Sequence, residues 1–169
     1  MNLSLKPFDA SGTAVIAGLA DRIWRAYYIR IISMVQIDYM LDKFYSKDSL
    51  LQQMSEGQEF YGIMLDNELN GFVSYSRKND HEYFIHKFYL IPELHGKHIG
   101  SEVMHMLFER MQERSAGMPF EVRLTVNRQN YQAINFYFRN GFIIEKTADF
   151  DIGEGYFMND FVMLYRKKN

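Results

Sequence analysis

The pattern of apolar and polar positions divides the chain into helical and extended segments. Apolar residues at steps of three and four indicate amphipathic helices, whereas short alternating or continuous apolar runs indicate strands. The predicted helices cover residues 13–28, 34–45, 46–54, 100–116 and 131–139. The predicted strands cover residues 3–8, 60–65, 72–75, 83–91, 121–126, 142–150 and 156–166. This order of elements is that of a mixed α/β protein.

Several boundaries between these segments carry specific signals. Ser46 is a candidate N-cap, because its hydroxyl can accept a hydrogen bond from a free amide of the third helix. The polar stretch 66–71 ends in glycine and predicts a hairpin turn, and Gly141 is placed to end the helix 131–139. The run 83–91 is almost wholly apolar or aromatic, which predicts a central strand that is covered on both faces.

Composition narrows the class of protein further. The 169 residues are 47% hydrophobic and 16% aromatic, which excludes a disordered chain and suffices for one domain with a sizeable core. The formal net charge is −2, which argues against a protein that binds nucleic acid by broad phosphate neutralisation. With no repeat, linker or charge block in the sequence, we expect a single domain over residues 1–169.

Cysteine is absent, and the histidines show no spacing that is typical of a metal site. The absence of cysteine excludes disulfides, thiolate metal sites and a cysteine nucleophile. The five histidines do not form a metal-binding pattern, so no metal is expected. The first residues lack signal-peptide features and no apolar run reaches the length of a membrane span, so we expect a cytoplasmic location without membrane contact.

Residues 95–101 join the predicted strand 83–91 to the helix that follows. Amides at the start of a helix lack internal partners and lie at the positive end of the helix dipole, so they bind anions. Two glycines let the backbone approach an anion closely, while Lys97 adds a positive charge and Ser101 a hydroxyl donor. The segment therefore predicts a cradle for a phosphate-bearing ligand, and an ordinary strand-to-helix loop is the alternative interpretation. The P-loop pattern does not occur, so nothing supports a nucleotide hydrolase.

At residues 87–100 the sequence resembles the pyrophosphate-binding segment of the GNAT superfamily of acetyl-CoA-dependent N-acetyltransferases, whose loop has the pattern Q/R-x-x-G-x-G/A. A second family segment matches through Asn127, Asn130, Ala133, Phe136-Tyr137 and Gly141-Phe142. The two segments occur in the family's order and separation, so the resemblance covers nearly the whole chain. It implies a central, mixed, mostly antiparallel sheet of about seven strands that is flanked by about four to five helices.

Two residues of the loop differ from the family pattern. His95 stands where glutamine or arginine is usual, and His98 stands where the first glycine is usual. Because the loop binds mainly through backbone amides, its conformation matters more than its side chains. A protonated His98 would help to bind the anion, and a neutral one would narrow the loop.

The resemblance implies a set of residues that binds acetyl-CoA. Backbone groups of the strand would align the acetyl and pantetheine portions, and loop amides would hold the pyrophosphate. Asn130 would contact the pantetheine arm, Phe136 would pack against the cofactor and Arg139 would reach the 3′-phosphate. The full cofactor-binding set is Phe88, Tyr89, Leu90, His95, Gly96, Lys97, His98, Ile99, Gly100, Ser101, Asn130, Phe136 and Arg139.

Two residues are candidates for proton transfer. Tyr137 matches the tyrosine that protonates the departing CoA thiolate in many family members, and a packed aromatic residue is the alternative role. The incoming amine must be neutral to attack, which requires a base or a path through water. Phe84 occupies the position where the family often has a carboxylate, and His86 lies two residues further on the same face. His86 is the candidate base, with a core or rim histidine and ordered water as alternatives.

Other segments concern the acceptor. Residues 36–41 and 153–156 resemble a PaiA-like branch of the family that is associated with polyamine acetylation. Several carboxylates would form an acidic mouth attractive to a polycation, with solvated surface charge as the alternative. These carboxylates are Asp38, Asp149, Asp151, Glu154 and Asp160.

The leading hypothesis is an acetyl-CoA-dependent N-acetyltransferase that acts by direct transfer on a polyamine, another small amine or a peptide N-terminus. The lack of cysteine disfavours a thioester on the enzyme. A non-catalytic acyl-CoA-binding module or sensor on the same fold is the alternative, and a structural domain without CoA binding is a third. Homodimerisation is a further expectation from the resemblance.

Overall fold

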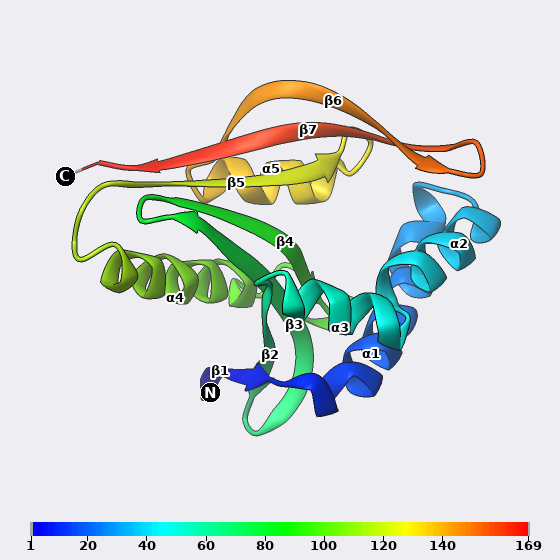
Figure 1. The fold of residues 1–169 in the computed structure, drawn as a ribbon, viewed down its shortest axis with the longest axis horizontal. Helices are drawn as coiled ribbons and strands as arrows, with labels where there is room; N and C mark the ends of the chain where they lie inside the picture. The colour runs from blue at the N-terminus through cyan, green and yellow to red at the C-terminus, as the bar shows by residue number, and fades with distance from the viewer. Residues whose placement is uncertain (1, 169) are drawn as a thin grey trace. The chain divides into compact units, whose positions relative to one another are not determined.

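The computed structural model describes residues 2–168 and confirms the mixed α/β class (Figure 1). Its seven strands have the order β1-β2-β3-β4-β5-β7-β6, and five α-helices accompany them. The strands are β1 (Leu3–Phe8), β2 (Glu59–Leu65), β3 (Glu68–Asn79), β4 (Glu82–Leu90), β5 (Phe120–Asn127), β6 (Ile143–Gly153) and β7 (Tyr156–Lys167). The helices are α1 (Thr13–Tyr27), α2 (Met34–Tyr45), α3 (Lys47–Ser55), α4 (Ile99–Arg114) and α5 (Tyr131–Arg139).

Strand pairing is mostly antiparallel, as the family resemblance implies. The pairs β1–β2, β2–β3, β5–β7 and β6–β7 are antiparallel, whereas β4 and β5 run parallel. The chain divides into two compact units: a first unit of residues 2–76 and 86–103, and a second unit of residues 77–85 and 104–168. The expected single domain over residues 1–169 stays a prediction.

In the first unit, serine side chains begin two of the three helices that pack together. The Ser33 hydroxyl accepts from the Gln36 amide at 3.2 Å and starts α2, and the Ser46 hydroxyl accepts from the Ser49 amide at 3.4 Å and starts α3. Such a cap stabilises a helix by about 1 kcal/mol. The predicted cap at Ser46 is confirmed. The core of this unit includes Ile16, Ile37, Leu50, Ile63 and Phe72.

The hairpin between β2 and β3 is tighter than the polar stretch 66–71 predicts. Only Asp66 and Asn67 form the turn, with φ of 49° and 70°, and β3 begins directly after them. Two left-handed residues suit a type I′ turn, and aspartate and asparagine adopt that conformation more readily than other non-glycine residues. Gly71, which suggested a longer turn, lies within β3. A Cβ there would lie 2.2 Å from the Tyr89 carbonyl oxygen, so glycine allows β3 to approach β4 closely.

β4 is covered less completely than its apolar sequence predicts. Tyr83, Ile85 and Lys87 are buried, whereas Phe84 is half-buried and His86 is exposed. Because successive side chains of a strand point to opposite faces, this alternation gives the strand one buried face. The prediction of cover on both faces is therefore wrong for this part of the strand.

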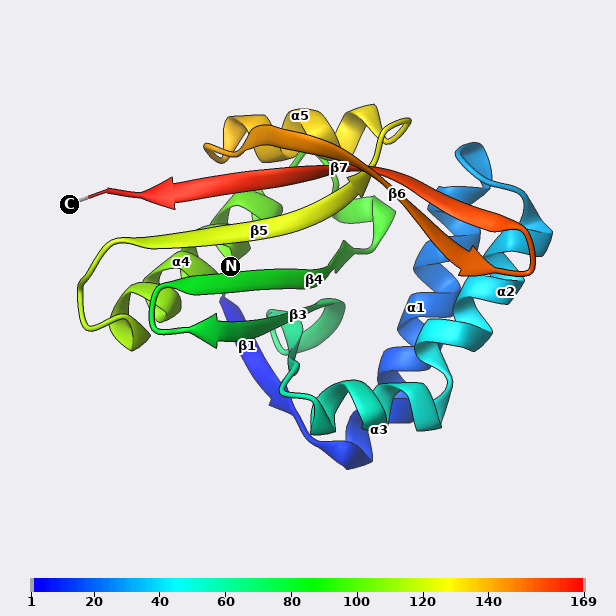
Figure 2. The same cartoon turned by 45° about the horizontal axis from the view of Figure 1, so that its top comes forward.

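In the second unit, β6 and β7 form a long hairpin beside β5 (Figures 1 and 2). Its turn is formed by Glu154 and Gly155, with φ of 53° and 77°, so both strands are longer than predicted. Gly141, at φ 86°, follows the end of α5 as predicted. No helix within residues 2–168 combines the length and the apolar character needed to cross a bilayer.

Aromatic contacts attach α4 and α5 to one face of the strands of the second unit. The ring of Phe108 on α4 stacks on Tyr165 of β7, with 4.0 Å between centroids. Tyr137 on α5 meets Phe142 edge-on at 5.6 Å, and Phe142 lies 5.7 Å from Tyr165. The helices therefore cover one face of β5 and β7, and the opposite face carries the polar side chains of these strands.

Candidate functional site

A tight turn follows β4 in the first unit and leads into α4. Gly96 and His98 adopt the left-handed conformation, with φ of 75° and 63°. Open space surrounds the position of a Cβ on Gly96, so the backbone conformation alone favours glycine there. A left-handed non-glycine residue costs about 1 kcal/mol. His98 carries this strain at the position where the family pattern has glycine, which gives a physical reason for that glycine.

His95 fixes the turn against the rest of the first unit. One of its ring nitrogens, Nε2, lies 3.1 Å from the Leu90 carbonyl oxygen at the end of β4. The ring also meets Tyr27 of α1 edge-on, with 5.5 Å between centroids. The side chain of His95 therefore anchors the turn, a role that the sequence analysis did not foresee.

Three of the seven amides in residues 95–101 already donate to backbone carbonyls. The His95 amide donates to Pro92, the Lys97 amide to Leu94 and the Ser101 amide to His98, at 3.0, 3.4 and 3.0 Å. Binding of an anion would therefore depend mainly on the other four amides. These amides belong to Gly96, His98, Ile99 and Gly100.

Aromatic rings pack around the end of β4 in the first unit. Trp24 stacks on Tyr28 with 4.6 Å between centroids, and the Tyr89 ring lies 6.0 Å from Trp24. The parallel ladder between β4 and β5 covers Glu82 to Ile85 of β4. Phe88 and Leu90, on either side of Tyr89, lie beyond this ladder. The Tyr89 side chain is thus part of the packing, and a ligand would meet this stretch through its backbone.

Lys87 is a buried basic side chain on β4 that the sequence analysis did not single out. Its ammonium group bonds Gln53 Oε1 at 2.5 Å and lies 5.4 Å from the ring centroids of both Tyr45 and Phe60. The side chain is 8% exposed, and burial lowers its pKa to about 8. Cation–π attraction to two rings partly offsets the loss of water.

His86, the predicted base, is exposed on the other face of β4. Its Nε2 lies 2.8 Å from the Ser76 hydroxyl of β3, so the two side chains share a hydrogen bond. This contact sets the orientation of the ring. The role of His86 as a base stays a prediction.

The predicted residues of the second unit lie on and before α5. The Asn130 side chain caps this helix, because its Oδ1 accepts from the Ala133 amide at 3.2 Å. Tyr137 is 8% exposed and packs against Phe136 on the same helix, with 5.2 Å between centroids. Arg139 is exposed at the end of the helix. The N-cap thus fixes the helix that carries the predicted proton donor.

Asp160 is a buried carboxyl on β7, in the same unit as α5. It pairs in register with Asn127 at the end of β5 and is 6% exposed. Burial raises its pKa to about 6, whereas a hydrogen bond from Thr125 and the charge of Arg128 act in the opposite direction. Among the acidic residues of the predicted mouth, Asp38 pairs with Arg25 and is not a bare charge.

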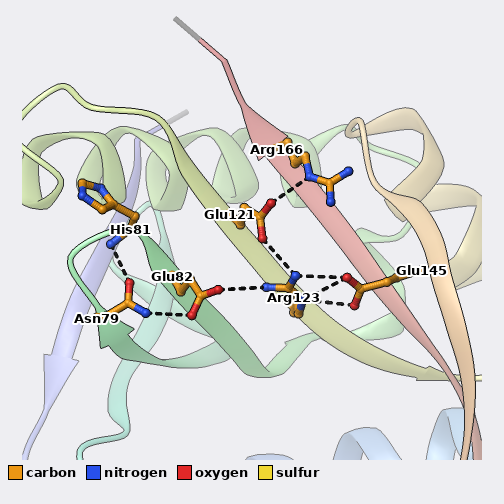
Figure 3. Close-up of polar contacts among 7 residues, drawn as sticks. All are labelled: Asn79, His81, Glu82, Glu121, Arg123, Glu145 and Arg166. Carbon is orange, nitrogen blue, oxygen red and sulfur yellow. Dashed lines mark hydrogen bonds and ion pairs between the residues drawn. The ribbon is translucent and has the colours of Figure 1, made fainter.

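Figure 3 shows a network of charged side chains on one face of the second unit. Arg123 of β5 donates three hydrogen bonds to Glu145 of β6, at 3.0, 3.0 and 3.3 Å, and pairs with Glu121 at 2.9 Å. Arg166 of β7 donates to the other Glu121 oxygen at 2.7 Å. These hydrogen bonds hold the pKa values of Glu121 and Glu145 below their usual range. Partly exposed pairs of this kind add little stability each.

A depression of about 550 Å³ adjoins this network. Glu121 and Arg166 line it, at the amino end of β5. Asn127 lies six residues further along the strand, which is about 20 Å at about 3.3 Å per residue. The depression therefore lies at the end of β5 opposite to Asn127. Within residues 2–168, no group of three or more histidine, aspartate or glutamate side chains is arranged to hold a metal ion.

A sequence model of the acetyltransferase (GNAT) family matches residues 19–142, which is most of the chain. The chain belongs to this family. Spermidine N(1)-acetyltransferase of Thermoplasma acidophilum is 27% identical over 156 residues, which cover 89% of this chain and 94% of that protein. An uncharacterised N-acetyltransferase of Mycobacterium tuberculosis is 31% identical over 99 residues, which cover 59% of this chain and 61% of that protein.

Solved structures of GNAT proteins share the fold. PaiA N-acetyltransferase from Thermoplasma acidophilum, crystallised in complex with coenzyme A, superposes with a TM-score of 0.79 at 27% identity. The match covers 99% of this chain and 100% of that chain. The predicted resemblance to a PaiA-like branch is confirmed. As a GNAT protein, the chain is an acetyl-CoA-dependent N-acetyltransferase, and the comparisons favour the enzyme over a non-catalytic binding module.

Two buried ionisable side chains were missed or misplaced by the sequence analysis. Lys87 follows Tyr83 and Ile85 at steps of two, so the period of a strand already placed it on the buried face. Asp160 precedes Val162 and Leu164 at the same steps, yet its charge suggested a surface position. The signal was present in both cases, but the residue types argued against burial.

Proposed function

We propose that this GNAT acetyltransferase transfers the acetyl group of acetyl-CoA directly to a primary amine of a polyamine. The sequence similarity over 89% of the chain to a spermidine N(1)-acetyltransferase supports this class of acceptor. Charge in the first unit is consistent with it. Arg25 is shared by Asp21 at 2.8 Å and Asp38 at 2.7 Å, so two carboxylates share one guanidinium and leave a net negative charge.

The left-handed turn that leads into α4 is the observation that carries the transfer reaction. It leads directly into the start of α4, where amides lack partners within the helix, which suits the pyrophosphate of acetyl-CoA. Lys97 is exposed in the same turn and adds positive charge. The residues present therefore fit the donor. When bound, acetyl-CoA supplies an acetyl group activated as a thioester.

The remaining predicted residues complete the proposed donor site. Backbone groups of Phe88 and Leu90 would bond the acetyl and pantetheine portions in the manner of a strand. Asn130 and Phe136 would contact the pantetheine arm and the cofactor, and Arg139 would reach the 3′-phosphate. Tyr137 would give its phenolic proton to the departing thiolate. His86 is the histidine proposed as a base.

Thiol release in the presence of a panel of amines tests the proposal. The panel contains spermidine, spermine, a primary monoamine and a peptide with a free N-terminus, and calorimetry measures acetyl-CoA binding in parallel. We expect acetyl-CoA to bind and spermidine or spermine to give the highest kcat/KM. Binding of acetyl-CoA without thiol release on any amine would overturn the proposal of acetyl transfer. A higher kcat/KM for the peptide would overturn the proposal that the acceptor is a polyamine.

Replacement of the proposed proton donor provides a second test. Tyr137→Phe should lower kcat by about 100-fold, because a positioned acid contributes at least that much, while acetyl-CoA affinity stays unchanged. Tyr131→Phe is the matched control, since Tyr131 is 70% exposed on the same helix. Equal turnover in the two variants at every pH would remove Tyr137 as the acid.

A further inference from the structure

The carboxyl group of Asp160 has no role in the acetyl transfer as described so far. It lies on β7, directly opposite Asn127, the last residue of β5. Thr125 lies two residues before Asn127, so its side chain is on the same face of the sheet as Asp160 and diagonally adjacent to it. The neighbouring Thr125 side chain acts on the pKa of the carboxyl group as a hydrogen-bonding partner and lowers it.

Among the described contacts, the carboxylate of Asp160 forms no ion pair. Arg128, just after β5, forms its ion pair with Asp149 of β6, and its charge reaches Asp160 through space. Ala148 is the residue of β6 that lies opposite Asp160, and Lys146 lies two residues before it. A buried carboxylate with one hydroxyl donor and a remote arginine can gain and lose a proton near neutral pH, and its pKa of about 6 agrees with this.

Asp160 and Tyr137 lie on different faces of the sheet in the second unit. Tyr137 packs with Phe142, which in turn packs with Tyr165 on the face of the sheet that the helices cover. Asp160 is five residues from Tyr165, an odd number, so its side chain points to the opposite face.

We propose that Asp160 is a catalytic residue that accepts a proton from the ammonium group of the acceptor. The inference rests on the proposed function and names a base for it on β7. Two features of the second unit carry it: burial of the carboxyl, and its place opposite Asn127 and diagonally adjacent to Thr125, next to the segment that leads into Asn130.

The proton balance of the reaction is complete with this assignment. The ammonium group gives one proton to Asp160, and the neutral nitrogen then forms a bond with the carbonyl carbon of the thioester. The carbon–sulfur bond breaks, and the sulfur keeps the electron pair and takes a proton from Tyr137. The surplus proton on nitrogen returns to Tyr137, and Asp160 releases its proton to water. Ammonium and thioester thus give amide, thiol and one proton.

Other acids of the same hairpin do not combine these features. Asp149 is exposed and is neutralised by Arg128. Asp151 is exposed, and its Oδ1 accepts from the Gly153 amide at 2.8 Å in the approach to the turn. Glu154 forms the turn itself. Asp160 is the acid of this hairpin that burial and a hydroxyl partner prepare for proton transfer.

The pH profile of kcat/KM in Asp160→Asn tests the proposal, with the amine that the wild-type protein uses best. Asparagine keeps the shape and the acceptor oxygen but takes no proton. We expect activity at pH 7 to fall by about 100-fold, because a positioned base contributes at least that much. The deficit should shrink as the pH rises toward the pKa of the amine, since more of the amine is then already neutral. Acetyl-CoA affinity, measured by calorimetry, should not change.

Glu113→Gln is the matched control, because it removes the same negative charge from an exposed position of the same unit. It should keep the wild-type profile. Wild-type activity in Asp160→Asn, or a deficit that is equal at every pH, would overturn the inference and leave the proposed function intact. Loss of the acid limb of the kcat/KM profile in His86→Asn, and not in Asp160→Asn, would also overturn the inference and leave the proposed function intact. A wild-type protein inactive on every amine would overturn the proposed function and this inference together.

Thr125→Val provides a test that does not depend on the folding of Asp160→Asn. Valine has nearly the shape of threonine but donates no hydrogen bond to the carboxylate. The acid limb of the kcat/KM profile should therefore move to higher pH, by about one unit. An acid limb that does not move would show that another group titrates there and would overturn the inference.

Discussion

Each compact unit buries a side chain that carries charge in water, Lys87 in the first and Asp160 in the second. Burial lowers the pKa of Lys87 to about 8 and raises the pKa of Asp160 to about 6. The cause is the same in both, because loss of water disfavours the charged form. The two shifts have opposite signs because one group is a base and the other an acid.

The neighbours of the two groups differ in a way that separates packing from chemistry. Lys87 is held by Gln53 of α3 and by the rings of Tyr45 and Phe60, so three elements fix one position of its ammonium group. Asp160 has the hydroxyl of Thr125 and no ring above it in the described contacts. A group that is enclosed on all sides stabilises a packing arrangement. A group with one flexible donor can exchange a proton. Burial alone therefore does not identify a functional residue.

Lys87→Met should stabilise the folded protein. A pKa lowered from 10.5 to about 8 means that the charged form opposes folding at pH 7 by about 3 kcal/mol, at about 1.4 kcal/mol per pH unit. Loss of the two cation–π contacts offsets part of this, which leaves a gain of about 1 to 2 kcal/mol for methionine. Because the unfolded chain binds this proton up to pH 10.5, wild-type stability rises between pH 8 and 10.5. Urea denaturation at pH 7 and at pH 10.5 measures the effect, and the gain should disappear at the higher pH.

Lys97→Met is the control for this change, because Lys97 is exposed and lies on the same unit. It should leave stability within about 0.5 kcal/mol of wild type. A gain in Lys87→Met that is equal at both pH values would show that the better packing of methionine, not the buried charge, is responsible. Acetyl transfer should persist in Lys87→Met, which would set this residue apart from Asp160.

Asp160→Asn should stabilise the protein by about 1 to 2 kcal/mol at pH 7 while it lowers activity. The folded protein keeps the carboxyl proton up to a pH of about 6, whereas the unfolded chain loses it near 3.8. Wild-type stability therefore falls as the pH rises from about 4 to 6, and the advantage of the variant is absent at pH 4. Denaturation at pH 4 and pH 7 checks the sign. If Asp160→Asn is instead less stable than the wild type by the same amount at pH 4 and pH 7, Asp160 contributes to packing, as Lys87 does.

Regular elements were predictable from the sequence because local signals determine them. Ser46 was identified as a cap from its residue type and position, and residues 34–45 and 131–139 are helices with the predicted bounds. The turn at Asp66 and Asn67 was predicted too long, since the glycine at position 71 was needed for a contact with β4 and not for the turn. Long-range contacts of this kind are not visible in local sequence.

The candidate site was predictable where it depends on backbone conformation and less so where it depends on partners. The turn at residues 95–101 was identified, together with the unusual His98, because glycine and helix-start signals are local. The packing of His95 against Tyr27 and the burial of Asp160 depend on residues that are distant in the sequence. Charge at a position was taken as exposure, and the alternation of β7 gave the opposite answer.

His98→Gly should give the smallest effect and separates backbone strain from buried charge as a source of instability. Glycine adopts φ 63° freely, so the substitution relieves about 1 kcal/mol of backbone strain. The greater conformational freedom of glycine in the unfolded chain offsets about half of this gain. A net gain of about 0.5 kcal/mol is expected. Because the cause is conformational, the gain should be the same at pH 7.5 and pH 10, unlike the gain in Lys87→Met. His98→Ala removes the same ring but keeps a Cβ and the strain, so it should show no gain. Equal gains for alanine and glycine in urea denaturation would trace the effect to the imidazole ring and not to the left-handed backbone.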